Sequence, residues 1–238
     1  MTKIDPTIFS DSYFLSGQLL IINKESGWTS FDAVNKIRGL LKKKTGIKRI
    51  KVGHAGTLDP LATGLLLICT GKATKNISGY QGMEKEYIAT VKLGATTPSF
   101  DAETEVDRTY AVSHIDEAMI RDTLIRFTGT SEQIPPAYSA KNIDGVRAYK
   151  LARRGEEVRL EPHVITVREA ELVGVNLPEF TVRFVCSSGT YIRSLARDLG
   201  IAMDSGGYLT QLTRIRIGEF LIEDSITVKN FEKMLFNM

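Results

Sequence analysis

Hydrophobic residues recur along this chain at the spacings of strands and helices. From position 87 the apolar residues Tyr87, Ala89, Val91 and Leu93 occupy every second position, which is the pattern of a half-buried strand. Residues 65–69 form an unbroken apolar run of the length of a fully buried strand. Further strands are predicted over residues 18–23, 164–172 and 180–186.

Polar caps and apolar stripes predict the helices. Thr29 and Asp32 have the spacing of a capping box, in which two side chains bond each other's backbone N–H groups at the start of a helix. The helix that follows ends in lysines, which suit the negative end of a helix dipole. Its predicted core-facing residues are Phe31, Val34, Ile37 and Leu41. Other helices are predicted over residues 115–127, 146–154, 191–199 and 231–236, with Gly200 ending the third, and another begins at 70–75.

The order of these elements indicates the fold class. Strands and helices alternate without the regular rhythm of a parallel sheet, so we expect an α+β fold with a largely antiparallel mixed sheet flanked by helices and loops. The length of 238 residues allows a sizeable core. Residues 1–16 are expected to form an N-terminal arm, and Pro135 and Pro136 begin an extended loop.

Charge is distributed unevenly along the chain. The 31 basic and 28 acidic residues give a net charge of only +3, which is weak evidence for a nucleic-acid partner. The basic residues are clustered, however, and separated charge of this kind suits a surface that binds RNA phosphates. A solvated lysine-rich loop is the alternative for the first cluster, and a solvated helix face for the second. The clusters are Lys42, Lys43, Lys44, Lys48, Arg49 and Lys51, then Arg147, Lys150, Arg153 and Arg154, whereas acids gather at Asp101, Glu103, Glu105 and Asp107.

Several classes of protein are excluded by composition. The two cysteines, Cys69 and Cys186, lie in apolar runs and are expected to be buried thiols. The three histidines are scattered, so a metal site is not expected. The chain has no apolar run of membrane-spanning length and no signal peptide at its start, so a cytoplasmic protein is expected.

One acidic residue stands alone on a glycine-framed loop. Asp59 is the only acid between Asp32 and Glu84, and three glycines and a proline surround it within residues 53–64. Asp-Pro is also a common turn dipeptide, so a purely structural turn is the competing interpretation. The buried strand that follows the loop favours a site, because it would hold one side chain rigidly.

Five motifs in order resemble those of the TruB family of pseudouridine synthases, which modify the T-loop uridine of tRNA at position 55. The first is GHAGTLDPLATGLLLICTGKATK, residues 53–75, and the second is Lys-Glu-Tyr at 85–87. Residues 135–140 resemble the start of the family's RNA-clasping thumb segment, and 186–193 and 206–214 resemble its last two motifs. The resemblance covers about residues 17–220.

The resemblance implies a reaction and a catalytic residue. Isomerisation of uridine needs no cofactor, because nothing is oxidised and no group is gained. Asp59 matches the catalytic carboxylate, which acts as a nucleophile or a base at the sugar. Arg193 matches a guanidinium that keeps this acid ionised, and Tyr87 matches the residue that stacks on the target base. The remaining candidates for substrate binding are Leu212, Tyr191, Arg214 and His54.

The target base must leave its stack in the RNA, and His54 matches the residue that takes its place. Arg147, Lys150 and Arg154 are candidates for contacts with the RNA backbone, since they would share one face of a helix in the thumb-like segment at about residues 131–155. The expected partner is the T-arm of tRNA, with no metal, no membrane and no obligate protein partner.

The chain also departs from the family pattern. Many relatives carry a C-terminal RNA-binding domain of the PUA type, and residues 17–238 are expected to form a catalytic domain without it. Glu25 follows Lys24 where relatives often have proline, so no functional role is inferred for Lys24. Two alternatives stay open: a guide-RNA-dependent pseudouridine synthase, and a non-catalytic RNA-binding or tRNA-folding protein.

Overall fold

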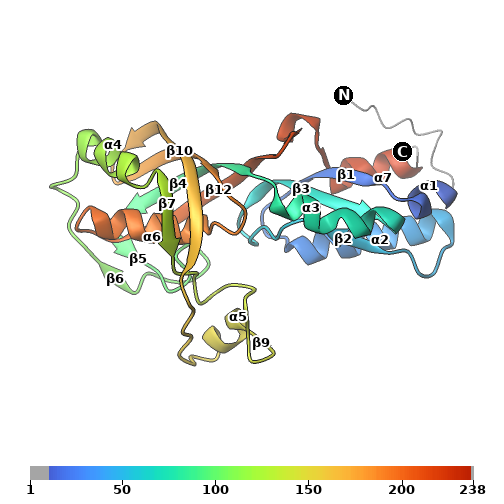
Figure 1. Ribbon diagram of the computed structural model, residues 1–238, viewed down its shortest axis with the longest axis horizontal. Helices are drawn as coiled ribbons and strands as arrows, with labels where there is room; N and C mark the ends of the chain where they lie inside the picture. Colours follow the sequence, from blue (N-terminus) through green and yellow to red (C-terminus); the bar gives the residue numbers. More distant parts are fainter. Residues whose placement is uncertain (1–10, 237–238) are drawn as a thin grey trace. The chain divides into compact units, whose positions relative to one another are not determined.

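The computed structural model describes residues 11–236 (Figure 1). They form two compact units: one contains the described residues up to Glu86 together with those from Thr213 onward, and the other spans Tyr87–Leu212. The long strands β4 (Lys85–Leu93) and β12 (Gly207–Ile217) contribute residues to both units. The expected arm lies mostly on residues 1–10, outside the described residues, and residues 11–16 form a helix.

The first unit is a sheet with strand order β14-β1-β3-β12, with β2 paired to β3 and β13 to β12. Strand β1 is antiparallel to β3, whereas β3 and β12 are parallel, so the sheet is mixed as expected. Its elements are α1 (Asp11–Ser16), β1 (Leu19–Lys24), α2 (Ser30–Thr45), β2 (Val52–His54), β3 (Thr63–Thr70), the 3-10 helix η2 (Gly71–Asn76), α3 (Ile77–Gly82), β13 (Phe220–Leu221), the 3-10 helix η3 (Ile222–Asp224), β14 (Ile226–Thr227) and α7 (Val228–Phe236).

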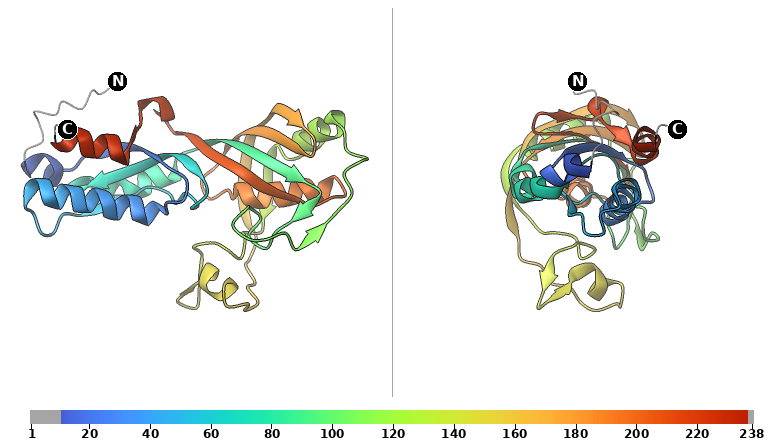
Figure 2. Two further views of the ribbon diagram at one scale, coloured as in Figure 1. Left: turned by 180° about the vertical axis from the view of Figure 1, so that it is seen from behind. Right: turned by 90° about the vertical axis from the view of Figure 1, so that its right-hand side faces the viewer.

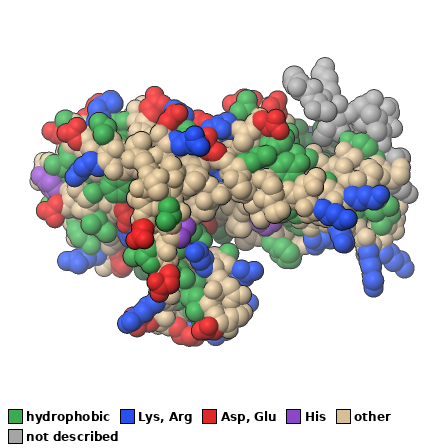
Figure 3. All heavy atoms as spheres, viewed as in Figure 1, with side chains coloured by type: hydrophobic (Ala, Val, Ile, Leu, Met, Phe, Trp, Pro, Cys, Tyr) green, Lys and Arg blue, Asp and Glu red, His purple; other side chains and the backbone are tan. Residues whose placement is uncertain are grey.

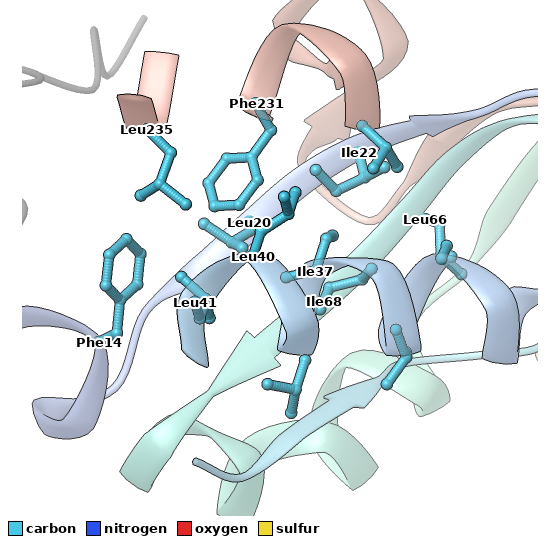
Figure 4. Close-up of a cluster of buried hydrophobic side chains, with 14 of the residues drawn as sticks. Phe14, Leu20, Ile22, Ile37, Leu40, Leu41, Leu66, Ile68, Phe231 and Leu235 are labelled. Atoms are coloured by element: carbon cyan, nitrogen blue, oxygen red, sulfur yellow. The ribbon is translucent and has the colours of Figure 1, made fainter. Parts of the chain in front are cut away.

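The middle of strand β3, residues 65–69, is apolar at every position because both of its faces are covered. Leu66 and Ile68 belong to a cluster shared with α1, α2 and α7, and Figure 4 shows Ile68 beside Ile37 of α2. Leu65 and Leu67 pack on the other side with Ala55, Ile217 and partly buried neighbours. Figure 2 shows α2 running alongside these strands in two further views.

The capping box of α2 is confirmed, but one residue of its predicted core face is not buried. Thr29 and Asp32 bond each other's backbone, and Val34, Ile37 and Leu41 are buried. Phe31 is 62% exposed, which contradicts its predicted place in the core. The inward position of the first helical turn belongs to Ser30, whose hydroxyl bonds the backbone of Leu58.

The second unit has strand order β12-β4-β11-β10-β7, with two small hairpins, β5-β6 and β8-β9. Strand β10 is antiparallel to both β11 and β7. Its elements besides β4 and β12 are β5 (Ala95–Thr96), β6 (Arg108–Thr109), α4 (Glu117–Arg126), β7 (Gly129–Gln133), β8 (Asn142–Ile143), β9 (Val146–Arg147), α5 (Ala148–Ala152), β10 (His163–Asn176), β11 (Glu179–Cys186) and α6 (Ile192–Ala202). The expected α+β class with a mixed, largely antiparallel sheet is confirmed.

Gly200 lies inside α6 and does not end it, so the prediction of a helix stop was wrong. Because Gly200 has no side chain, α6 can pack closely against the start of β12. A Cβ there would lie 2.3 Å from the backbone nitrogen of Gly207, at the start of β12. The glycine therefore lets helix and strand backbones approach closely.

The helix predicted over 146–154 is also shorter than expected. Residues 142–147 form the hairpin β8-β9, and only Ala148–Ala152 are helical. Asp144 and Gly145 have φ values of 50° and 86°, as a two-residue hairpin turn requires, so the Asp-Gly dipeptide was the signal for it. Lys150 alone of the three backbone candidates lies in the helix. Figures 1 and 2 show this segment projecting from the rest of the second unit.

Candidate active site

The loop that carries Asp59 is fixed through its backbone. Every carbonyl from Gly56 to Leu61 accepts a hydrogen bond, and Leu58 also donates its N–H to Ser30 Oγ over 2.8 Å. Buried carbonyls bonded in this way cannot move without losing a partner. The donors are Arg214 to Gly56 and Thr57, Ser30 to Leu58, the N–H of Ala62 to Asp59, Lys24 and the N–H of Gly27 to Pro60, and Ser26 to Leu61.

Gly64 allows β3 and β12 to meet at the end of this loop. Its φ is +103°, and a Cβ at this position would lie 2.3 Å from the carbonyl oxygen of Arg214. Only glycine fits both conditions. The close approach places the Arg214 side chain within hydrogen-bond distance of the Asp59 loop.

Arg214 is a buried cation that faces the loop, with 1% of its surface exposed. Its Nε donates to the Leu65 carbonyl over 2.8 Å, and its two terminal nitrogens reach Thr57 and Gly56 over 3.3 and 3.2 Å. The structure therefore shows Arg214 as a support of the Asp59 loop. Its predicted contact with substrate stays a prediction.

Lys24 is a second buried cation next to the loop, and the sequence analysis assigned it no role. It ends β1 with 1% of its surface exposed, and its ammonium donates to the carbonyls of Trp28 (2.7 Å), Glu25 (3.0 Å) and Pro60 (3.3 Å). Burial lowers the pKa of Lys24 to about 8, and the nearby charge of Asp59 opposes that shift. Buried residues occupy every second position of β1, and Lys24 falls on one of them. This position in the strand was the signal for its burial.

Turnover should fall as the pH rises through about 8, because a neutral Lys24 has only two N–H donors for the three carbonyls that its ammonium bonds beside the Asp59 loop. Since the folded pKa lies below the ordinary value of 10.5, the unfolded chain holds more protons between these values, and the folding stability contributed by this group rises with pH there. An alkaline loss of turnover without unfolding is thus expected in a pH profile of kcat/KM monitored by circular dichroism.

A Lys24→Met variant provides the comparison. Its turnover at pH 7 should be lower by roughly tenfold, as for loss of one nearby charge, and its profile should lack the step near pH 8. The exposed Lys36→Met, which removes the ion pair with Glu232, should keep the step. A wild-type profile that stays flat from pH 7 to 9.5 would refute this role of Lys24.

His54 lies at the end of β2, immediately before the loop, and is half buried. Burial, more than any other cause, lowers the pKa of His54, so the imidazole is neutral at pH 7. Within the part of the chain that the structure describes, its Nδ1 is buried without a hydrogen-bond partner. A neutral, flat ring suits a place in a base stack, although that role is untested.

Arg193 is held by groups of the second unit, at the start of α6. It is 3% exposed, and its Nε lies 3.6 Å from Oδ2 of Asp101. Its other nitrogens donate to the carbonyls of Ser99 (3.1 Å) and Tyr138 (2.9 Å). The predicted pairing of Arg193 with Asp59 joins residues of different units and stays a prediction.

Asp101 is the buried partner of Arg193, and the sequence analysis missed it. It was grouped with three exposed acids, but it is buried, and its Oδ1 accepts from Ser99 Oγ (2.6 Å) and the N–H of Glu103 (2.9 Å). No local signal separates it from Glu103, since its burial depends on Arg193, which is distant in sequence.

The other predicted residues of the second unit lie on β4, β12 and α6. Tyr87 is buried on β4, and Leu212 is half buried on β12. Tyr191 exchanges two backbone hydrogen bonds with the side chain of Gln133, at the foot of the thumb-like segment. Tyr191 and Arg193 thus both contact this segment.

The three backbone candidates of the thumb-like segment are exposed but do not share a helix face. Arg147 in β9 donates to the Ala140 carbonyl over 2.6 Å, and Arg154 lies 3.6 Å from Glu156. Lys150 is exposed on α5. Arg153, in contrast, pairs with Glu103 at 2.5 Å.

Two further classes of site were tested on residues 11–236. No group of three metal-ligating side chains occurs among them. None of the helices described there is long and apolar enough to cross a membrane. Both cysteines are buried thiols, as predicted, and burial raises the pKa of Cys69 to about 11.

Two solved structures share this fold. A crystal structure of a Cbf5–Nop10–Gar1 complex matches with a TM-score of 0.69 and 24% identity, over 96% of this chain and 57% of that one. The structure of an H/ACA RNP bound to a substrate RNA containing 2′-deoxyuridine matches with a TM-score of 0.67 and 23% identity, over 96% of this chain and 56% of that one. At these identities the likeness concerns the fold alone.

Sequence comparison identifies the family. The model of the TruB family pseudouridylate synthase (N-terminal domain) matches residues 42–192. The tRNA pseudouridine synthase B of Phocaeicola vulgatus is 54% identical over 93% of this chain and 94% of its own length. That of Flavobacterium johnsoniae is 52% identical over 93% and 97%. The chain therefore belongs to the TruB family of pseudouridylate synthases.

Proposed function

We propose that this chain isomerises uridine to pseudouridine in tRNA, at position 55 of the T-loop. The N1–C1′ bond of the nucleotide breaks, the base turns, and C5 bonds to C1′. The proton lost from C5 is balanced by the proton that N1 gains, so the substrate and product have the same atoms. The reaction therefore consumes no co-reactant.

Sequence identity near 50% over 93% of the chain to relatives named tRNA pseudouridine synthase B is the observation that carries this proposal. The geometry supports it, because Asp59 lies on a loop whose carbonyls are all bonded and which two buried cations contact. Such a loop presents one carboxylate to a substrate in a fixed position.

This chemistry gives each of the predicted site residues a role. Asp59 acts as the nucleophile or as the base at the sugar. Tyr87 stacks on the extruded base, Leu212 and Tyr191 line its pocket, and His54 fills the place that the base vacates. Arg193 is proposed to supply a positive charge for the catalytic carboxylate.

The thumb-like segment at about residues 131–155 is proposed to clasp the T-arm. Exposed Arg147, Lys150 and Arg154 supply positive charge for the RNA backbone. Hydrogen bonds between Gln133 and Tyr191, and from Arg193 to Tyr138, fix the base of the segment. The segment that binds RNA is therefore in direct contact with Arg193.

The purified chain alone should form pseudouridine in an unmodified T-arm stem-loop. The product is mapped at single-nucleotide resolution, and the matched control is the same hairpin with cytidine at the target position. Product that forms without a guide RNA and without a second protein supports the proposal.

Two other results would contradict it. Product that appears only with an added guide RNA would indicate the guide-dependent class. Tight binding without any product, on both the hairpin and whole tRNA, would indicate a non-catalytic RNA-binding protein.

A further inference from the structure

Six exposed cations follow one another at the end of α2. We call them the basic segment, and they are Lys42, Lys43, Lys44, Lys48, Arg49 and Lys51. The sequence holds no acidic residue between Asp32 and Asp59. Figure 3 shows Lys and Arg side chains projecting where α2 ends in Figure 1.

Helix stability accounts for only half of the basic segment. Lys42, Lys43 and Lys44 lie in the last turn of α2, where cations are favourable, and Lys43 also lies over the Phe236 ring at 5.0 Å. The helix ends at Gly46. The last three cations lie beyond it, so the helix dipole gives no reason for them.

The charge of the basic segment is not neutralised locally. Among residues 11–236 none of its six side chains is in an ion pair, and the acid contributed by α7, Glu232, pairs with Lys36 at 3.0 Å. Like charges held close together repel, so an anionic partner would stabilise this surface.

Helix α2 connects the basic segment to the Asp59 loop. Its first residue, Ser30, bonds Leu58 in that loop. At a rise of ~1.5 Å per residue, Lys43 lies about 20 Å from Ser30 along the helix. A double-helical RNA stem advances only a few ångströms per base pair, so this distance corresponds to several base pairs.

We propose that the basic segment binds phosphates of the double-helical stem of the same RNA whose loop reaches Asp59. The contact lies several base pairs from the target uridine. A duplex backbone is a row of closely spaced anions, which matches a row of cations uninterrupted by acids. This inference rests on the proposed function for the identity of the RNA.

The test is a triple variant, Lys48→Gln with Arg49→Gln and Lys51→Gln, which leaves α2 intact. Binding is measured by fluorescence anisotropy against salt, for T-arm hairpins with stems of about four and about twelve base pairs. With the long stem we expect roughly tenfold weaker binding at 0.1 M salt and a log–log salt slope shallower by about 2. With the short stem we expect the wild-type affinity.

A second triple with the same change of charge is the control: Arg108→Gln, Arg121→Gln and Arg159→Gln, all exposed in the second unit. It should weaken long-stem binding less than twofold. A charge-preserving triple, Lys48→Arg, Arg49→Lys and Lys51→Arg, should restore the wild-type affinity, which excludes misfolding as the cause.

Equal losses in the two neutralising triples, or equal losses on short and long stems, would overturn the inference. The binding readout does not depend on turnover. If the wild type binds as expected but forms no pseudouridine, the proposed function fails while the basic segment remains an RNA contact.

Discussion

Replacing Asp59 by Asn should reduce pseudouridine formation by about 10³-fold or more, since an amide can act neither as the nucleophile nor as the base. Asn keeps the size of the side chain, and the loop is held by its carbonyls. The fold and the affinity for tRNA should therefore be unchanged. Single-turnover kinetics at saturating enzyme measure the chemical step, and anisotropy measures binding.

The matched control for this experiment is Asp122→Asn, an exposed carboxylate on α4. It makes the same chemical change on the second unit and should retain wild-type rates. An Asp59→Asn variant whose single-turnover rate is within tenfold of the wild type would remove Asp59 from the chemistry, and with it the interpretation of the whole loop.

Replacing Arg193 by Lys should lower turnover by roughly 100-fold or more, although the charge is conserved. A single ammonium cannot bond Asp101, Ser99 and Tyr138 at once in the planar geometry of a guanidinium. Each buried acceptor left without a donor costs about 1–3 kcal/mol of unfolding free energy. The measurements are single-turnover rates and urea unfolding.

Arg193→Met is expected to cost more stability, about 3–5 kcal/mol, because it leaves Asp101 buried and unpaired. Adding Asp101→Asn should recover part of that loss but none of the turnover. This double variant separates the structural role of Arg193 from its proposed role in catalysis. The exposed Arg121→Lys is the control, and near-normal turnover of Arg193→Lys would exclude a geometric role for the guanidinium.

Elements and residues with local signals were predictable from the sequence. The capping box fixed the start of α2, the apolar run predicted the doubly covered β3, and a lone acid framed by glycines identified the loop. Each of these depends on residues within one turn or one strand. The roles of the predicted site residues are not tested by geometry alone and stay predictions.

What could not be predicted depends on contacts between distant segments. Asp101 is buried because of Arg193, and Gly200 is glycine because the backbone of Gly207 meets it. Phe31 has the spacing of a core residue, yet the first turn of α2 faces the Asp59 loop through Ser30. No functional role was inferred for Lys24, because Glu25 follows it where relatives often have proline. The burial of Lys24 depends instead on its position in β1.

The hydrogen bonding of the Asp59 loop determines which spectroscopic probe can detect its rigidity. Its backbone is restrained mainly through oxygen atoms, whereas amide hydrogen exchange reports on N–H groups. Rapid exchange at these positions would be compatible with a static catalytic carboxylate. Carbonyl ¹³C chemical shifts, which respond to the acceptor side of a hydrogen bond, are the spectroscopic probe that this loop requires.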